Sequence, residues 1–441
     1  MGEMLKHQPI SAEKVSPEKS QPESKIWEKK EKEKTHEIKF SSTTHELDFD
    51  NPEDWDKEKF RQSLRLQKTA GIDRINYDFS WTRINPEQGQ FKKGQLDIYT
   101  QAKQVMEEEG METPDIIFTV APDYVRKLYE GGNKKEFFKA YEDYITQVRE
   151  ALIVAGGKKI ETVQIFNELN NKIYTFVEPD DLAEMCQITR DVFKEYNPDI
   201  KLKATLHAGS LNTLTDKTGK ALKKVGFDSL GEKVGIGIDV KDYLEQNRDM
   251  LKENFDSLAI NYYPGMWHWP LKEAGLKKRD FLLNFNKTKR IFAQTDLLER
   301  VFRELDDMDM KYEIGEYGLP TNKPSWSKKD NKYYEDKQRY AFDVFTHALR
   351  VVLKKLHDEG KDLPSYLGLY ESQNRRPRNE GEIKTKKRTM NLFPEHDFGL
   401  MDEEGKPKEL LRGKRGRYTE EERVAHEPHL NVLKRQLNRP L

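Results

Sequence analysis

Short apolar runs alternate with amphipathic stretches along most of the chain, beginning near residue 38. The runs are rich in β-branched and aromatic residues and end in small or polar residues, as buried strands do. The stretches between them repeat apolar residues at helical spacing, as helices that cover a sheet do. The pattern predicts eight strands, at residues 38–42, 74–80, 115–120, 162–166, 201–206, 257–261, 312–315 and 365–370.

The predicted helices lie between these strands. Two of them end at Gly71 and Gly156, because glycine readily adopts the left-handed backbone that closes a helix. Eight strands that alternate with helices favour a closed parallel barrel over an antiparallel sandwich. We therefore predict an α/β fold, a single (β/α)8 TIM barrel over residues 38–411. The helices are expected at 54–70, 95–109, 134–155, 180–196, 239–254, 296–307 and 336–358.

The two ends of the chain differ from the barrel in composition. Residues 1–37 are rich in Lys, Glu, Ser and Pro, and such a segment cannot bury enough apolar surface to offset its ordering entropy. We expect a disordered or frayed tail there. Residues 412–441 are expected to form a charged helical or extended tail.

Composition and motifs exclude several classes of function. The formal net charge of the 441 residues is -1, so nucleic-acid binding is not expected. No apolar run reaches the roughly 18 residues of a spanning helix, and no secretory signal opens the sequence, so we expect a cytoplasmic protein without membrane contact. The single cysteine, Cys186, falls in a helical pattern and is expected to be buried and inert. Nucleotide-binding and zinc-binding motifs are missing, so we expect no cofactor and no metal. The oligomeric state stays open.

Two glutamates follow predicted strands and are the candidate catalytic residues. Glu168 follows the fourth strand and Glu316 follows the seventh. Parallel strands of a barrel deliver their carboxyl ends to one face, so these side chains can meet there. Retaining cleavage of a glycoside needs two carboxyl groups roughly 5–5.5 Å apart, one as nucleophile and one as acid/base. A lone glutamate would be interpreted as a helix cap or a surface ion pair, but two at these strand ends favour catalysis.

Several motifs lie around these strands. They are Asn-Glu at 167–168, Gly-Glu-Tyr-Gly at 315–318, Ser-Trp-Thr-Arg-Ile-Asn-Pro at 80–86, Asn-Tyr-Tyr at 261–263 and Phe-Gly-Leu-Met-Asp at 398–402. In these motifs the chain resembles the clan A (β/α)8 retaining glycoside hydrolases over residues 39–411, and it is most similar to family 1, the β-glucosidase-like enzymes. The resemblance implies that Glu168 is the acid/base, that Asn167 contacts the sugar 2-hydroxyl and that Glu316 is the nucleophile.

The sequence departs from the family 1 pattern at four places. Leu169 stands where family 1 has proline, and Val-Ala-Pro-Asp-Tyr at 120–124 replaces the third-strand His-Trp pair. Asn76 occupies the place of the second-strand arginine, with Arg74 two residues earlier on the same face, and Tyr370 replaces the eighth-strand tryptophan. Losing hydrogen-bonding partners for one terminal sugar weakens its recognition. We therefore expect longer β-linked oligosaccharides to be better substrates than simple aryl glucosides.

Other residues near the strand ends are candidates for binding the substrate. Tyr263 is expected to donate a hydrogen bond to Glu316. His207 ends the fifth strand, where a sugar ligand and a hydrogen-bonded structural histidine are equally expected. Flat indole rings in the sixth and seventh loops can stack on sugar faces. The candidate substrate-binding residues are Asn167, Tyr263, His207, Trp267, Trp269, Trp326, Tyr370 and Glu371.

Three functions compete at this point. The first is hydrolysis of β-linked glycosides by double displacement, with a carbohydrate as the partner molecule. The second is a catalytically weakened, carbohydrate-binding barrel of the same clan, against which both glutamates argue. The third is a barrel lyase or aldolase, which needs a strand-end lysine for a Schiff base, and none of the eight strands clearly offers one.

Overall fold

The computed structural model describes residues 38–44, 47, 52–69, 71–119, 121–171, 174–208, 240–262, 287–317, 347–369, 382–384 and 389–391. The barrel lies within the compact unit formed by residues 37–441. The predicted tails at 1–37 and 412–441 lie outside the described residues.

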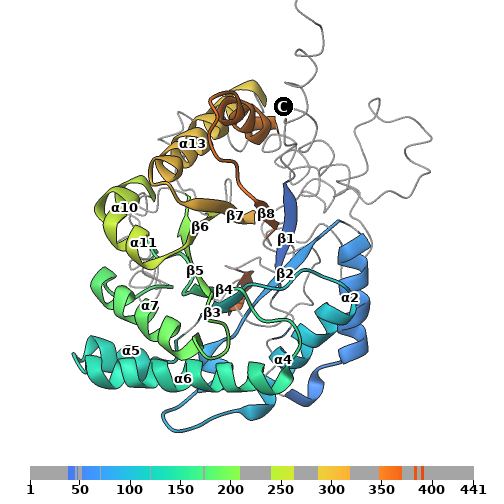
Figure 1. The fold of residues 1–441 in the computed structure, drawn as a ribbon, viewed down its shortest axis with the longest axis vertical. Helices are drawn as coiled ribbons and strands as arrows, with labels where there is room; N and C mark the ends of the chain where they lie inside the picture. Colours follow the sequence, from blue (N-terminus) through green and yellow to red (C-terminus); the bar gives the residue numbers. More distant parts are fainter. Residues whose placement is uncertain are drawn as a thin grey trace, which may run out of the picture. The chain divides into compact units, whose positions relative to one another are not determined.

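Eight parallel strands close into a barrel in sequence order, with β8 pairing to β1 (Figure 1). Each predicted strand overlaps an observed one, so the predicted (β/α)8 barrel is confirmed. The strands are β1 (Lys39–Thr44), β2 (Arg74–Asp78), β3 (Ile116–Phe118), β4 (Thr162–Ile165), β5 (Lys201–His207), β6 (Ser257–Tyr262), β7 (Lys311–Tyr317) and β8 (Tyr366–Leu369).

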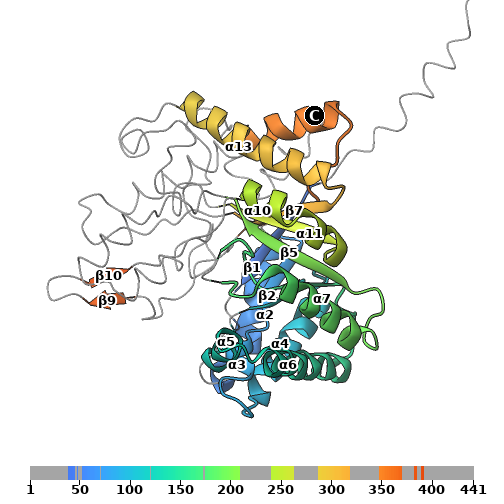
Figure 2. The same ribbon diagram turned by 90° about the vertical axis from the view of Figure 1, so that its left-hand side faces the viewer.

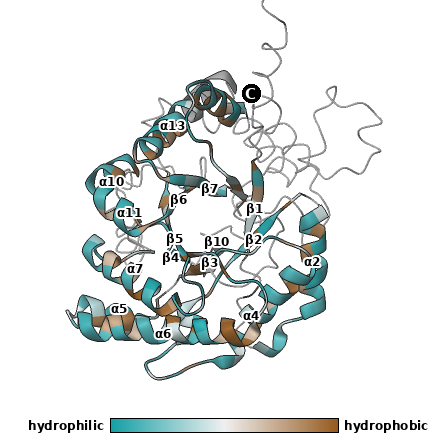
Figure 3. Cartoon of the chain, in the orientation of Figure 1, coloured by the Kyte–Doolittle hydropathy of each residue, from teal (hydrophilic) through white to brown (hydrophobic). Residues whose placement is uncertain are grey.

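Helices surround the strands, as two perpendicular views show (Figures 1 and 2). Many of these helices are two-toned in hydropathy, as expected where one face packs on strands and the other faces water (Figure 3). Residues 347–358 are also helical. The helices are α2 (Lys57–Thr69), α3 (Trp81–Ile84), α4 (Lys93–Glu108), α5 (Asp123–Glu130), α6 (Lys134–Ala155), α7 (Pro179–Phe193), α10 (Val240–Gln246), α11 (Arg248–Asn254) and α13 (Lys287–Asp307), with a 3-10 turn η1 (Pro52–Asp54).

Two predicted helix ends, at Gly71 and Gly156, are confirmed. One predicted helix is wrong, because it is interrupted at Asn247. Gly71 and Gly156 have φ of 95° and 65°, the left-handed backbone expected after a helix. The helix predicted over 239–254 is instead two helices, α10 and α11, divided at Asn247. The Asn247 side-chain Nδ2 donates to the Tyr243 carbonyl at 3.0 Å, and this local bond competes with helix continuation.

Four short elements and the first nine residues of α13 were not predicted. Helices α3 and α5 follow β2 and β3 directly, and the antiparallel pair β9 (Glu382–Lys384) and β10 (Thr389–Asn391) lies in the segment after β8. Helix α13 starts at Lys287, well before the predicted start at residue 296. Short elements such as α3 hold too few apolar repeats for a periodic pattern to reveal them.

The apolar core lies between the strands and the helices. Trp81 of α3 is buried and stacks on Tyr144 of α6, with ring centroids 5.0 Å apart and planes 10° apart. Cys186 on α7 is buried, as predicted, and burial raises the pKa of its thiol to about 12. This core anchors the outer faces of the strands and leaves their inner faces to polar residues.

Candidate active site

The inner face of β5 shows how the barrel interior is divided into levels. Alternation along the strand points Lys203, Thr205 and His207 inward, each closer to the carboxyl end than the one before. Lys203 contacts Asp115 and Glu313, Thr205 contacts the end of β4, and His207 contacts Glu168. We call the first group the lower level and the group around Glu168 the upper level.

The chain after β4 bends so that Glu168 lies inside the barrel. Phe166 and Glu168 have left-handed backbones, with φ of 57° and 50°. Such a conformation costs a residue with a side chain about 1–2 kcal/mol, so surrounding contacts must hold it. The Glu168 N–H donates to Thr205 Oγ1 at 2.8 Å, and the Leu169 N–H donates to the Thr205 carbonyl at 2.8 Å. These two bonds tie the bend to β5.

The Glu168 carboxylate is buried, with 4% of the residue exposed, and is surrounded by donors. Its Oε2 accepts a hydrogen bond from Asn171 Nδ2 at 2.8 Å. Its Oε1 lies 3.2 Å from His207 Nδ1 and 3.5 Å from Asn261 Nδ2. The carboxylate is therefore held from three elements of the chain, the segment after β4 and the ends of β5 and β6.

A bulge in β7 turns Glu316 into the barrel. Ile314 pairs with Ile260 of β6, but Glu316 pairs with the next residue, Asn261, so Gly315 is the extra residue. In a regular strand Glu313 and Glu316, three positions apart, would point to opposite faces. The bulge reverses the alternation, and both side chains face inward. Tyr317 then packs outward on Tyr262, with ring centroids 6.1 Å apart.

Glycine is required at the bulge and beside it. A Cβ on Gly315 would lie 2.8 Å from Asn261 Oδ1 and 3.0 Å from the Ala259 Cβ. A Cβ on Gly368 of β8 would collide with the Gly315 carbonyl. The close approach of these backbones thus depends on two residues without side chains.

Asn261 joins the two glutamates. Its Nδ2 donates to Glu316 Oε2 at 3.0 Å and lies 3.5 Å from Glu168 Oε1. Those two carboxylate oxygens are therefore at most 6.5 Å apart, the sum of the two distances. Glu316 is 6% exposed and Asn261 is fully buried. The structure thus brings together the two glutamates that the sequence places 148 positions apart (316 minus 168).

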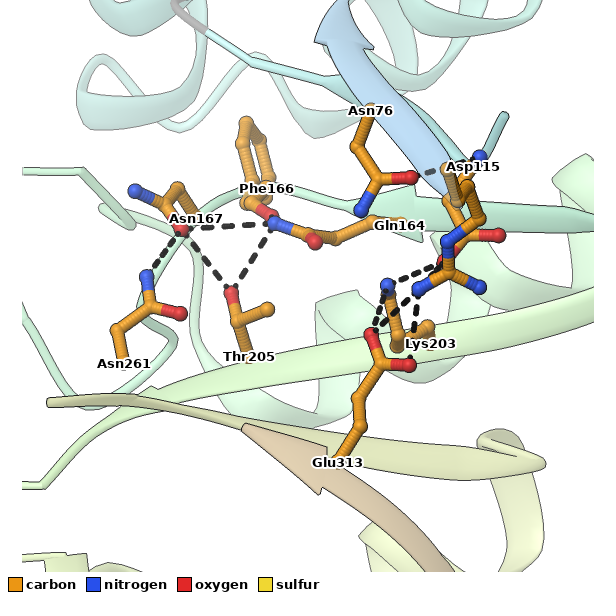
Figure 4. A network of polar contacts seen from close by, with 10 residues as sticks. Asn76, Asp115, Gln164, Phe166, Asn167, Lys203, Thr205, Asn261 and Glu313 are labelled. Carbon is orange, nitrogen blue, oxygen red and sulfur yellow. Dashed lines mark hydrogen bonds and ion pairs between the residues drawn. The ribbon is translucent and has the colours of Figure 1, made fainter. Parts of the chain in front are cut away.

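Asn167 is held by a polar network with Gln164, Thr205 and Asn261 (Figure 4). Its Oδ1 accepts hydrogen bonds from Thr205 Oγ1 at 3.2 Å, Asn261 Nδ2 at 3.2 Å and Gln164 Nε2 at 3.4 Å. Gln164 Nε2 also donates to Thr205 Oγ1 at 3.1 Å. With three donors on its oxygen, the orientation of the Asn167 amide is fixed, and its Nδ2 is directed away from this network.

The environment of Glu168 acts on its pKa in two directions. Burial raises the pKa of this carboxyl group, because a low-dielectric surrounding disfavours the charged form. The charge and hydrogen bond of His207 and the amide donors of Asn171 and Asn261 lower it. The lowering prevails, and the pKa of Glu168 lies below its usual value of 4.5.

The lower level is a cluster of two cations and two anions (Figure 4). Arg74 lies 2.9 Å from Glu313 and 3.2 Å from Asp115, and Lys203 lies 2.6 Å from Glu313 and 2.5 Å from Asp115. Burial opposes the charge of Glu313, but Arg74 and Lys203 outweigh it and hold the pKa of Glu313 at about 2. The Arg74 guanidinium also lies 3.8 Å from the centre of the Tyr366 ring. Each charge here has opposite charges within ion-pair distance.

Of the ten predicted site residues, the structure describes four. Glu168 is one of them, and Asn167, His207 and Glu316 lie close to it. Tyr263, Trp267, Trp269, Trp326, Tyr370 and Glu371 lie outside the described residues. Sequence reasoning missed Asn171, Thr205 and Asn261 as site residues. Asn261 carried a signal, because it belongs to the Asn-Tyr-Tyr motif and shares a strand face with Tyr263.

The described part of the chain holds neither a cluster of metal ligands nor a membrane-spanning helix. In these residues no three His, Cys, Asp or Glu side chains are grouped to bind a metal ion. None of the described helices is both long enough and apolar enough to cross a membrane.

Comparison with known sequences gives one partial match. The family model of glycoside hydrolase family 42, described as β-galactosidase, matches residues 50–114. This segment contains α2, β2, α3 and α4, and with them the Ser-Trp motif at 80–86. No match was found among the curated proteins.

Comparison with solved structures finds the same barrel in glycoside hydrolases. The exo-β-1,4-mannosidase Op5Man5 from Opitutaceae bacterium strain TAV5 has a TM-score of 0.54 at 12% identity, covering 92% of this chain and 61% of that one. A GH5_18 protein from Streptomyces cattleya in complex with GlcNAc has a TM-score of 0.56 at 11% identity, covering 92% and 82%. A GH5_18 protein from Bifidobacterium longum subsp. infantis has a TM-score of 0.54 at 10% identity, covering 91% and 79%.

These likenesses establish a fold and support a class of activity. At such low identity the structures share the barrel with this chain, which spans less than two thirds of the mannosidase. The solved structures show the same barrel, and the family 42 match, which covers residues 50–114, supports a glycosidase. Neither comparison points to family 1.

Proposed function

We propose that this protein is a retaining glycoside hydrolase that cleaves β-linked glycosides by double displacement. The observation that supports it best is the shared Asn261 amide, which limits the Glu168 and Glu316 oxygens to a separation of 6.5 Å. Retaining enzymes need roughly 5–5.5 Å between carboxyl groups, whereas inverting enzymes need about 6.5–9.5 Å to admit a water. The bound therefore favours direct attack by one carboxylate.

In this mechanism Glu316 attacks the anomeric carbon while Glu168 protonates the leaving oxygen. A glycosyl ester then joins the sugar to Glu316, and the ionised Glu168 removes a proton from the water that hydrolyses it. Asn167 has its Oδ1 fixed by three donors, so its Nδ2 is available to donate to the sugar 2-hydroxyl. The assignment of the two glutamates follows the clan resemblance, whose closer likeness to family 1 rests on sequence motifs alone.

The stereochemical test uses the purified protein and a panel of aryl β-glycosides. Proton NMR of the first product formed from a cleaved substrate should show retained β configuration. A 2-deoxy-2-fluoro glycoside of the same sugar should add its mass to the intact protein, with the label on Glu316. An α product, or a label on another residue, would contradict the proposed roles.

A separate test concerns the acid/base. Glu168→Ala should slow both steps, and added azide should restore deglycosylation, because this small nucleophile needs no general base. The product should then be the β-glycosyl azide. The matched control is Glu316→Ala, in which azide should instead give an α-linked product or none.

One observation favours a second candidate, a carbohydrate-binding barrel without turnover. The pKa of Glu168 is below its usual value, so the free protein holds little of the protonated form that a general acid requires. Sugar binding to wild type, measured by calorimetry, together with no cleavage of any glycoside at any pH, would support this candidate and overturn the hydrolase.

For the substrate, we propose β-linked oligosaccharides in an open cleft. The third-strand His-Trp pair is replaced by Val-Ala-Pro-Asp-Tyr at 120–124, so ligands for one terminal sugar are missing and aromatic residues of the loops compensate by stacking. We expect kcat/KM to rise from aryl glycosides of a monosaccharide to those of the matching di- and trisaccharides. A high rate on the monosaccharide glycosides that does not rise with length would contradict this. The residues proposed to bind the sugar, besides Asn167 and His207, are Tyr263, Trp267, Trp269, Trp326, Tyr370 and Glu371.

A further inference from the structure

Asn261 has more acceptors around its amide nitrogen than it has hydrogens to donate. Its Nδ2 lies 3.0 Å from Glu316 Oε2, 3.2 Å from Asn167 Oδ1 and 3.5 Å from Glu168 Oε1. A side-chain amide carries two N–H groups, so the three oxygens compete for them. The longest of the three distances is to Glu168, so in this structure Glu316 and Asn167 receive the better bonds.

The orientation of this amide is set by its surroundings. All three neighbours of Nδ2 are acceptors, and a flipped amide would place its oxygen against two carboxylates. Asn261 Oδ1 is buried without a hydrogen-bond partner among the described residues, on the side left open by Gly315. An unpaired buried carbonyl is unfavourable, so the contacts of Nδ2 must compensate for it.

The charge between these glutamates moves during double displacement. When Glu316 attacks, its carboxylate becomes a neutral ester, and Glu168 becomes a carboxylate as its proton goes to the leaving oxygen. When water hydrolyses the ester, the water proton returns to Glu168 and the negative charge returns to Glu316. A donor between the two groups can serve the ionised one in each half.

We propose that Asn261 is a positioning residue that shares one N–H between the two glutamates, bonding to Glu316 before glycosylation and to Glu168 while the glycosyl ester exists. The inference rests on the proposed function and deepens it. Because hydrogen bonds to charged groups are the strong ones, one amide stabilises the site in both halves of the reaction.

Asn171 provides a matched control, because its described bond to a glutamate goes to Glu168, whereas the Asn261 amide lies between both glutamates. Its Nδ2 donates to Glu168 Oε2 at 2.8 Å, with the same amide chemistry as Asn261. Removing it disturbs the acid/base and leaves the bond from Asn261 to Glu316 in place. Asn261→Ala and Asn171→Ala thus separate a donor between the two glutamates from a donor to Glu168.

The experiment compares these variants on two aryl β-glycosides of one sugar, a 2,4-dinitrophenyl and an unsubstituted phenyl glycoside. The dinitrophenolate leaves without a proton, so formation of its glycosyl ester reports on Glu316 and not on acid catalysis. Asn171→Ala should lose little kcat/KM on the dinitrophenyl glycoside and more on the phenyl glycoside. Asn261→Ala should lose about 10- to 100-fold on both, as expected for a lost bond to a charged group.

A second readout follows the later half of the reaction. Asn261→Ala should also slow hydrolysis of the trapped 2-fluoroglycosyl ester, measured as loss of the added mass. Azide should restore only part of its activity, because the nucleophile is also affected. Asn261→Asp keeps the shape but removes the donor and adds a charge, so it should lose more than Asn261→Ala on both glycosides. Circular dichroism and thermal unfolding should show that each variant is folded like wild type. If Asn261→Ala does not fold, Asn261→Asp replaces it in the kinetic comparison.

The outcomes that would overturn the inference are distinct from those that would overturn the function. If wild type turns over glycosides but both Asn261 variants follow the pattern of Asn171→Ala, the shared donor is wrong and the hydrolase stands. If Asn261→Ala slows ester formation and not ester hydrolysis, the amide serves Glu316 alone. If wild type cleaves no glycoside, the proposed function fails and this inference with it.

Discussion

The lower and upper levels of the barrel interior both bury two carboxylates, but they surround them differently. In the lower level Glu313 and Asp115 each lie within 3.2 Å of both Arg74 and Lys203. In the upper level Glu168 contacts two amides and an imidazole, and it shares the Asn261 amide with Glu316. One strand, β7, supplies a carboxylate to each level.

The two surroundings separate carboxylates whose charge is fixed, in the lower level, from carboxylates whose charge can change, in the upper level. A carboxylate held by two cations stays ionised over most of the pH range and contributes to structure. A carboxylate held by amides can gain or lose a proton, or accept a covalent bond, without leaving an unpaired cation behind. The barrel thus surrounds the lower carboxylates with two cations and the upper carboxylates with amides and one imidazole.

The largest effect is expected from Glu316→Gln. Kcat should fall by more than about 10⁴-fold, because loss of the proposed nucleophile removes the covalent route. The free energy of unfolding should change little, since glutamine keeps the size of the side chain and the Asn261 amide can still bond to its carbonyl. Hydrolysis of the best aryl glycoside and urea unfolding measure the two effects.

Glu313→Gln should give the opposite result. It leaves Arg74 and Lys203 with one anion instead of two, and breaking a buried ion pair costs about 3–5 kcal/mol of unfolding free energy. Kcat of the folded fraction should stay within a few-fold of wild type. The comparison would fail if this variant lost activity without losing stability, or if Glu316→Gln lost stability instead.

The two levels should also respond differently to acid. The pKa of Glu313 in the folded protein is about 2, below its usual value of 4.5, so its contribution to stability is complete above pH 4.5 and is lost as the pH falls toward 2. Thermal unfolding followed from pH 7 to 2.5 should show wild type and Glu313→Gln converging at low pH. A gap between them that stays constant with pH would contradict this.

The smallest effect is expected from His207→Gln. His207 lowers the pKa of Glu168, so the variant should raise it, and the alkaline limb of kcat/KM should move to higher pH. The other groups that face Glu168 are the neutral amides of Asn171 and Asn261 and, across the shared amide, Glu316. His357, which is exposed, gives the control His357→Gln, whose profile should match wild type. An unmoved limb in His207→Gln would mean that His207 does not govern Glu168.

The sequence predicted the strands that carry this site and the positions of its glutamates. It did not predict the bulge or the contacts between side chains. Strand order and the positions of Glu168 and Glu316 followed from local signals, such as apolar runs and helix-ending glycines. The inward turn of Glu316 did not, because alternation along β7 assigns Glu313 and Glu316 to opposite faces until the bulge at Gly315 is seen. A bulge depends on pairing with β6 and β8, and no local pattern encodes that.

Contacts between distant residues were equally hidden. Arg74 and Glu313 are 239 positions apart, and no local sequence pattern around either residue predicts that they are in contact. His207 was expected either to bind sugar or to be structural, and the structure places it 3.2 Å from Glu168. Polar residues on an inner strand face signal a polar interior, but partner choice is decided by the closure of the barrel.

The left-handed backbone at Phe166 and Glu168 stores conformational strain inside the barrel. Glycine at 168 would relieve about 1 kcal/mol or more of that strain, but it would also remove the carboxylate proposed as the acid/base. The Asn171 amide and the His207 ring would each lose a buried hydrogen bond to that carboxylate, which costs about 1–3 kcal/mol for each. The contacts that hold the carboxylate therefore also compensate for the strained backbone that carries it.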